Sequence, residues 1–199
     1  TYTADDWALT TTDPVALVIY EGLTYDGGSG NLCANCHQPR RTFPSTTNDD
    51  GTVSITSSHW GPHYGAQSSM LLGVGGATDG SAASHYSLVE NTCAGCHMGE
   101  GDDHNFTPSV ANSTACHSDA ESLDVNGGQT EVTAMMEELL AGLVALGCLD
   151  DEGHPIPADV PAAHAAAVWN YRHVYQDHSH GAHNPTYTKA LLQAGLDAL

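Results

Sequence analysis

The sequence predicts a mainly α fold with extensive loops, helices in the C-terminal part and little β structure. Apolar residues recur with a period of about 3.6 residues in the last third of the chain, beginning near Thr130. Glycine, proline and aspartate interrupt residues 38–80, which show little helical period. The pattern Cys-x-x-Cys-His occurs twice. We expect a loop-rich region, residues 1–128, and a helical region, residues 129–199, that together form one cooperative domain.

The first expected element is a short helix over residues 15–20. Asp13 can cap this helix, and Pro14 suits its first position, before an aliphatic run that ends at Tyr20. The glycines of residues 27–30 then end the helix and lead into the first Cys-x-x-Cys-His pattern. We expect this helix to contribute only to the core.

The two Cys-x-x-Cys-His patterns predict covalently attached haem. Two thiols separated by two residues can form thioethers with the vinyl groups of one porphyrin, and the next histidine is then the proximal iron ligand. Two copies in a chain with 13 histidines favour two haem c groups, whose faces would supply apolar area to a haem-cored fold. The predicted attachment cysteines are Cys33, Cys36, Cys93 and Cys96, and the predicted proximal ligands are His37 and His97.

Zinc and thiol redox chemistry explain the same patterns less well. The interval between Cys36 and Cys93 is far longer than the ~15–20 residues between the two halves of a zinc ribbon. Zinc also gives no reason for a histidine after both cysteine pairs. Neither pattern lies in the strand–helix context of a thioredoxin-like site. Haem therefore remains the favoured cofactor.

Each haem iron needs a sixth ligand, and several histidines lie near the two patterns. His59 and His63 stand in a Gly-Pro turn, where we favour His63 as a distal ligand over His59. His85 precedes the second pattern and His104 follows it, and both are further distal candidates.

A third, incomplete pattern lies at residues 113–117. Ser113 replaces the first cysteine, whereas Cys116 and His117 are retained. A third haem c could be attached through Cys116 alone, with His117 as its proximal ligand. Alternatively, the haem has been lost and Cys116 forms a disulfide with Cys148, or Cys148 supplies the second thioether. The even number of cysteines favours the disulfide, while the retained His117 and the surplus of histidines favour a third haem, which we adopt.

The last third of the chain is expected to be helical. The apolar period predicts one helix over residues 130–149, and a second helix is expected from about Val160 to Gln176, with Asp159 as a possible cap. Asn184 is expected to cap a final helix that has Pro185 at its first position. Because His183 immediately precedes this capped helix, it is the best distal candidate in the C-terminal part.

The charge of the chain excludes some classes of partner. Its net charge of −20 arises from 24 acidic residues and only 4 lysines and arginines. Such a surface repels nucleic acid and anionic lipid, and it suits cationic partners or metal ions, although we favour a simple adaptation for solubility. No apolar run approaches the ~20 residues of a membrane helix. The absence of an initial Met, covalent haem and six cysteines predict a processed, exported protein, either extracellular or periplasmic.

The sequence resembles a family of exported multihaem c-type cytochromes. The resemblance implies histidines on both faces of each iron, haems stacked closely enough for electron hopping, and a loop-rich fold with C-terminal helices. Some relatives in this broad group polymerise into extracellular filaments. Ser113 departs from the family pattern. The segments that carry the resemblance are residues 59–63, 71–73, 84–85, 93–98, 104–108, 116–117, 168–171 and 181–192.

The histidine supply and the resemblance favour electron transfer over catalysis. Iron with two histidine ligands has no open position for a substrate, and the expected partners are other redox proteins, extracellular electron acceptors or copies of this chain in a conductive filament. A soluble periplasmic carrier is an alternative. A small reductase of nitrogen or sulfur oxyanions, with one open haem, is a third hypothesis.

Overall fold

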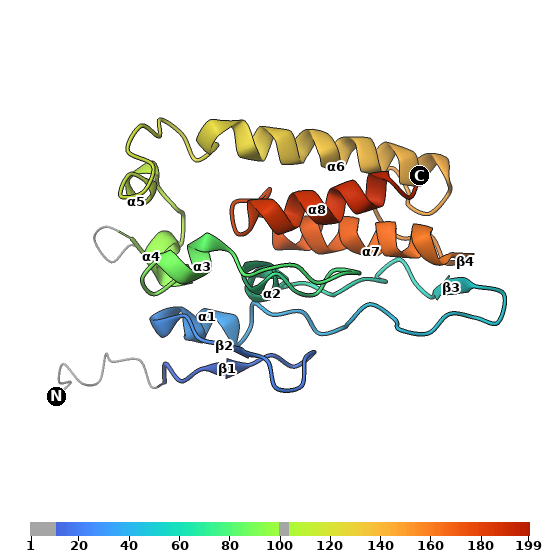
Figure 1. The fold of residues 1–199 in the computed structure, drawn as a ribbon, viewed down its shortest axis with the longest axis horizontal. Helices are drawn as coiled ribbons and strands as arrows, with labels where there is room; N and C mark the ends of the chain where they lie inside the picture. Colours follow the sequence, from blue (N-terminus) through green and yellow to red (C-terminus); the bar gives the residue numbers. More distant parts are fainter. Residues whose placement is uncertain (1–10, 100–103) are drawn as a thin grey trace.

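The computed structural model describes residues 11–99 and 104–199 (Figure 1). Three long helices, α6 (Gly128–Ala145), α7 (Ala162–Asp177) and α8 (Pro185–Leu196), lie side by side. The mainly α fold with little sheet and extensive loops is confirmed. The remaining elements are β1 (Val15–Ala16), β2 (Thr24–Tyr25), η2 (Gly28–Gly30), α1 (Asn31–Ala34), β3 (Thr52–Ile55), α2 (Gln67–Leu72), α3 (Ser84–Leu88), α4 (Cys93–His97), α5 (Val110–Ser113), η3 (Val125–Gly127) and β4 (Ala158–Pro161).

The N-terminal segment differs from the expected helix. Residues 15–16 form strand β1, which pairs antiparallel with β2, and the Leu17 N–H donates to the Leu23 carbonyl at 2.9 Å. Val15 and Leu17 are buried while Ala16 and Val18 are exposed, which is the alternation of a strand. The helix prediction is wrong because this β-branched run suits a half-buried strand better than a helix.

Helix α6 confirms the apolar period and has defined ends. The Asp124 carboxylate accepts hydrogen bonds from the Gln129 and Thr130 N–H groups, at 2.7 and 3.3 Å. The helix ends at Ala145, before the predicted Leu149, because Gly147 adopts φ +70°. In this turn the Gly147 N–H donates to Val144 and the Cys148 N–H donates to Leu143, which satisfies two carbonyls at the helix end.

Helices α7 and α8 largely match their predicted ranges. Residues 158–161 pair with β3 as strand β4, so α7 begins at Ala162, and Asp159 accepts a hydrogen bond from Ser54 instead of capping the helix. Asn184 caps α8 as predicted, since its Oδ1 accepts the Tyr187 N–H at 3.2 Å. The polypeptide between α7 and α8 therefore turns tightly around residues 178–184.

The main apolar core lies among the three long helices and β3. Trp169 of α7 packs edge-on against Trp60, with 5.0 Å between ring centroids, and Phe43 contacts both rings. A smaller cluster surrounds the buried Tyr25 beside α1 and α2. Within the described residues, no helix has the length and apolar character needed to cross a membrane.

His173 makes the stability of this core dependent on pH. Its side chain is fully buried in α7, and this burial lowers its pKa from 6.5 to about 4, although Asp177 acts in the opposite direction. Between pH 6.5 and 4 the unfolded chain binds a proton at this residue and the folded chain does not, so stability falls as the pH falls through this range. We expect a loss of about 3 kcal/mol in the free energy of unfolding.

The substitution His173→Leu, which nearly conserves volume, is expected to flatten this part of the pH profile. Urea unfolding of both proteins at several pH values between 4 and 6.5 measures how the free energy of unfolding depends on pH. An equally steep profile in the variant would assign the acid sensitivity to other groups.

Candidate haem-binding site

The two complete Cys-x-x-Cys-His patterns lie against each other in the fold. The turn before the first pattern packs on the residues just before the second, so that the Ser29 N–H donates to Asn91 Oδ1 at 3.1 Å. Thr92 Oγ1 donates to the Gly27 carbonyl at 3.1 Å and accepts from the Tyr25 hydroxyl at 2.9 Å. Helix α1, which contains Cys33, and helix α4, which contains the whole second pattern, therefore gather with α3 and α5 at one end of the molecule (Figure 1).

Gly30 allows this close approach. A Cβ atom at Gly30 would lie 2.3 Å from Thr92 Oγ1 and 2.7 Å from the Asn91 carbonyl oxygen, distances at which the backbone must shift. We expect Gly30→Ala to lower the free energy of unfolding by about 1–3 kcal/mol, the usual cost of overpacking. Chemical denaturation of the haem-loaded protein measures this change.

Gly128 provides the matched control for this substitution. It is helical, with φ −64°, and a Cβ atom there would meet nothing within 4 Å. Gly128→Ala is expected to be neutral or slightly stabilising because alanine has the better helix propensity. Equal destabilisation by both substitutions would contradict the special role of Gly30.

The predicted attachment cysteines are free thiols that are partly or fully exposed. Cys33 hydrogen-bonds to Cys93, and the Tyr25 hydroxyl lies 3.4 Å from Cys93 Sγ. The Cys33 hydrogen bond, with those of Tyr25 and Thr92, outweighs burial and lowers the pKa of Cys93 to about 5. The pKa of Cys33 is raised, chiefly by the same hydrogen bond to Cys93. Cys93 is therefore the readier of the two to form a reactive thiolate.

Both predicted proximal histidines have one ring nitrogen engaged. His97 Nδ1 lies 2.8 Å from the Phe106 carbonyl oxygen, and His37 Nδ1 lies 3.1 Å from Gln67 Oε1. These oxygens can only accept, so Nδ1 carries the proton in each ring and the Nε2 lone pair is free for a metal. Gln67 is held in turn, because its amide donates to the carbonyls of residues 176 and 177 at the end of α7.

Two predicted distal histidines show the same arrangement. His85 Nδ1 lies 2.7 Å from the Ala182 carbonyl oxygen, and His183 Nδ1 lies 2.7 Å from Asp177 Oδ1. Burial alone would lower the pKa of His183, but the Asp177 carboxylate outweighs burial and the pKa is raised. In both rings Nε2 again remains available as a metal ligand.

The histidine rings form two pairs, each containing a histidine of a Cys-x-x-Cys-His or Ser-x-x-Cys-His segment. The ring centroids of His97 and His183 are 6.3 Å apart, and those of His85 and His117 are also 6.3 Å apart. Two metal–imidazole bonds of about 2 Å, plus about 1 Å from each nitrogen to its ring centre, span about 6 Å. This spacing suits one iron between the members of each pair.

The other distal candidates are not paired in this way. His59, His63 and His104 are exposed, and within residues 11–99 and 104–199 none of their rings pairs with a proximal imidazole. His63 adopts φ +72° and packs edge-on against Tyr64.

Cys116 and Cys148 are both free and lie far apart. Cys116 is exposed just after α5, whereas Cys148 is buried in the main core beyond the opposite end of α6 (Figure 1). A helix of 18 residues is about 27 Å long. The structure therefore fits neither a Cys116–Cys148 disulfide nor a second thioether from Cys148.

Apolar side chains near the patterns are exposed, as a haem-binding surface requires. Leu32 adjoins the first pattern, Leu88 is 73% exposed on α3, and Phe106 supplies the carbonyl that holds His97. A hollow of about 240 Å³ adjoins His85 between residues 81–85 and 184–186. Free thiols, oriented imidazoles and uncovered apolar side chains together fit haem c.

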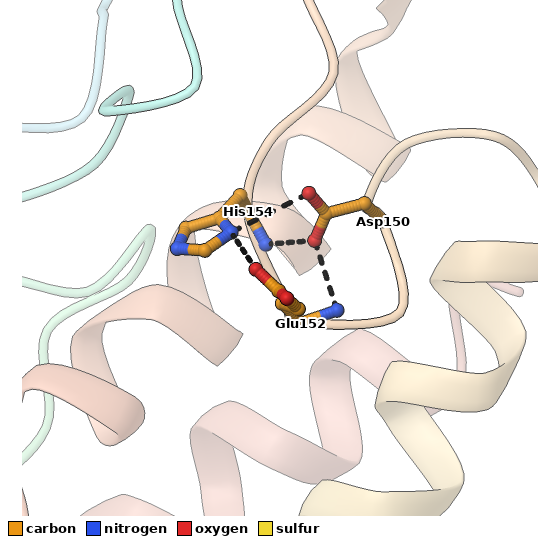
Figure 2. A group of neighbouring side chains, drawn as sticks. All are labelled: Asp150, Glu152 and His154. Carbon is orange, nitrogen blue, oxygen red and sulfur yellow. Dashed lines mark hydrogen bonds and ion pairs between the residues drawn. The ribbon is translucent and has the colours of Figure 1, made fainter.

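A separate acidic cluster lies in the turn between α6 and β4. Asp150 Oδ1 accepts the N–H groups of Glu152 and His154 at 3.0 and 2.8 Å, and His154 Nδ1 lies 3.4 Å from Asp150 Oδ2 (Figure 2). These exposed carboxylates stabilise the turn itself. The cluster is formed by residues of this turn and is remote from the haem-attachment cysteines in the sequence.

Sequence reasoning missed the groups that orient the histidines. Asp177 is six residues from His183 in the same histidine-rich segment, so its proximity was a usable signal. Gln67 and the carbonyls of Phe106 and Ala182 had no recognisable signal, because any residue provides a carbonyl and Gln67 lies 30 positions from His37.

Two curated proteins are similar to this chain. They are the "C-type polyheme cytochrome OmcB" proteins of two strains of Geobacter sulfurreducens, DL-1 / KN400 and PCA, each 24% identical over 235 residues. The alignment covers 86% of this chain and 31% of the relative, so the chain spans about a third of the length of these relatives. No family profile and no solved structure matches. The similarity indicates a relationship to multihaem c-type cytochromes.

Proposed function

We propose that this protein transfers electrons through c-type haems whose irons are each held by two histidines. The observation that carries the proposal is the occurrence of two histidine ring pairs at 6.3 Å, each containing the histidine of a haem-attachment segment. The similarity to a polyheme cytochrome supports the same function.

Haem c supplies a one-electron Fe(III)/Fe(II) couple. The residues of the chain would attach the porphyrins and supply imidazole ligands, and an iron held by two histidines would have no open position for a substrate. Nδ1 is hydrogen-bonded in His37, His85, His97 and His183, which holds these four rings in one orientation. Such rigidity keeps the reorganisation that accompanies electron transfer small.

Three haems are proposed. The second haem is attached at Cys93 and Cys96, between His97 and His183. The third is attached through Cys116 alone, between His117 and His85. The first is attached at Cys33 and Cys36, with His37 as proximal ligand, His63 as the favoured sixth ligand and His59 as the second choice.

The contact between the first two patterns supports rapid transfer between their haems. Tyr25 and Thr92 hold the turn before Cys33 against the residue before Cys93. Haems attached at these two neighbouring segments would lie near each other, which would suit electron hopping.

The location and partners follow from the cofactor and the charge. Covalent haem and six cysteines suit an exported protein, either extracellular or periplasmic. The net charge of −20 favours cationic surfaces on redox partners. We propose extracellular acceptors, other redox proteins or copies of the same chain in a conductive filament as partners, with a soluble periplasmic carrier as the alternative form.

Reduction potentials test histidine ligation directly. With histidine in place of methionine as the sixth ligand, and an acidic surface, we expect all haems to titrate below the potentials of His/Met cytochromes. Spectroelectrochemical titration of the purified protein measures this. A haem with a clearly higher potential would argue against two histidine ligands on that iron.

A reductase active at the first haem is a second candidate. It is favoured by one observation: within the described residues no histidine ring pairs with that of His37, whereas His97 and His117 are each paired with another histidine. Carbon monoxide binding to the native, reduced protein would show an open iron, and the absence of binding would exclude it. The charge of −20 disfavours anionic substrates.

A further inference from the structure

The four oriented histidines differ in the charge of the group that accepts their Nδ1 proton. The acceptors of His37, His85 and His97 are neutral carbonyl oxygens of a side-chain amide or the backbone. The acceptor of His183 is the Asp177 carboxylate, at 2.7 Å. A carboxylate accepts a stronger, charge-assisted hydrogen bond than a neutral carbonyl does.

The surroundings of Asp177 hold its carboxylate in this contact. Asp177 is 2% exposed, at the last position of α7. Its second oxygen accepts a hydrogen bond from the Ser179 hydroxyl, and Ser179 Oγ accepts the His183 N–H at 3.2 Å. Both carboxylate oxygens are therefore occupied, and the imidazole and the carboxylate are fixed relative to each other.

Resting on the proposed function, we propose that Asp177 is a positioning residue that gives the haem held by His97 and His183 a lower reduction potential than haems whose axial histidines are oriented only by neutral acceptors. The carboxylate draws the Nδ1 proton toward itself and makes His183 a more basic ligand. A more basic ligand stabilises Fe(III) relative to Fe(II), and so lowers the reduction potential of that iron.

The resulting difference in reduction potential between the haems would set the direction of electron flow. The haem at Cys93 and Cys96 is also the one whose attachment segment contacts the first haem segment through Thr92 and Tyr25. An electron on this low-potential haem would pass downhill to the haem of the first segment. Asp177 therefore biases the internal path without touching substrate or iron.

Asp177→Asn tests the inference in the haem-loaded protein. The amide keeps the size and one acceptor oxygen but removes the charge. One haem is expected to titrate at a higher potential, with an altered low-spin electron paramagnetic resonance signal, while the others are unchanged. Asp151→Asn is the matched control, because Asp151 is exposed in the turn after α6, and its loss of the same charge is expected to move no single haem.

Ser179→Ala is an independent variant that is expected to shift the reduction potential of this haem in the opposite direction. Removing its hydroxyl leaves one carboxylate oxygen without that donor, so the charge on Asp177 acts more fully on His183. The potential of the same haem is expected to fall.

Three results would overturn the inference. They are an unchanged potential in Asp177→Asn, a uniform shift of all haems equal to that of Asp151→Asn, and conversion of one haem to high spin, which would show that Asp177 is needed for ligation itself. In each case the unmodified protein would still show haems with two histidine ligands, so the proposed function would stand. An unmodified protein lacking such haems would instead refute the proposed function.

Discussion

The substitution His183→Ala is expected to convert one haem from six-coordinate low spin to five-coordinate high spin. His183 is the ring paired with His97 at 6.3 Å, and its removal leaves that iron with one protein ligand. The reduced variant should bind carbon monoxide at one haem, and the potential of that haem should rise because a basic imidazole has been lost. Optical and electron paramagnetic resonance spectra of the purified variant measure these changes.

His180→Ala is the matched control in the same loop. His180 Nδ1 hydrogen-bonds to Thr133 Oγ1 at 3.0 Å, and His180 is paired with no proximal imidazole among the described ring contacts. Its removal is expected to leave every haem low spin. If both variants kept all haems low spin, His183 would not be an axial ligand, and the pairing proposed here would be wrong.

The substitution Cys116→Ala is expected to remove one of three haems. Under denaturing conditions the intact mass is expected to equal the polypeptide plus three haems, and Cys116→Ala should lower it by one haem. The reason is that Cys116 is exposed beside His117, whose ring is 6.3 Å from His85, while Cys148 is buried elsewhere. Because one vinyl group would remain unreacted, the alkaline pyridine spectrum should contain a red-shifted component that Cys116→Ala removes.

Cys148→Ala is the control for the haem count. Because Cys148 is buried in the main core, its substitution should leave the mass at three haems and cost some stability. A wild-type mass of only two haems, with Cys116 found in a disulfide, would refute the third haem.

The sequence was most informative where the signal is local. Asn184 and Pro185 form a cap whose effect depends on a few neighbouring residues, and α8 begins where they predict. The apolar period placed α6 for the same reason. The segment after Asp13 was mispredicted because a capping pattern and a β-branched run compete there, and pairing with Thr24–Tyr25 decides between them.

The sequence predicts the parts of the candidate site but not their pairing. The attachment patterns predict the cysteines and the proximal histidines, and the need for a sixth ligand makes His85 and His183 candidates. Which histidine faces which depends on contacts between distant segments, such as His85 with the Ala182 carbonyl, 97 residues away. Asp159 was expected to cap α7 but lies in β4, because its pairing with β3 is equally non-local.

An experimental structure of the purified, haem-loaded protein, by crystallography or electron cryo-microscopy, tests the central claim most directly. The account predicts one iron between His97 and His183, a second between His85 and His117, and a single thioether at Cys116. The same map would show whether subunits join into filaments with continuous haem stacks. Water, or a residue other than the paired histidines, bound to either of these two irons would contradict the proposed bis-histidine electron carrier.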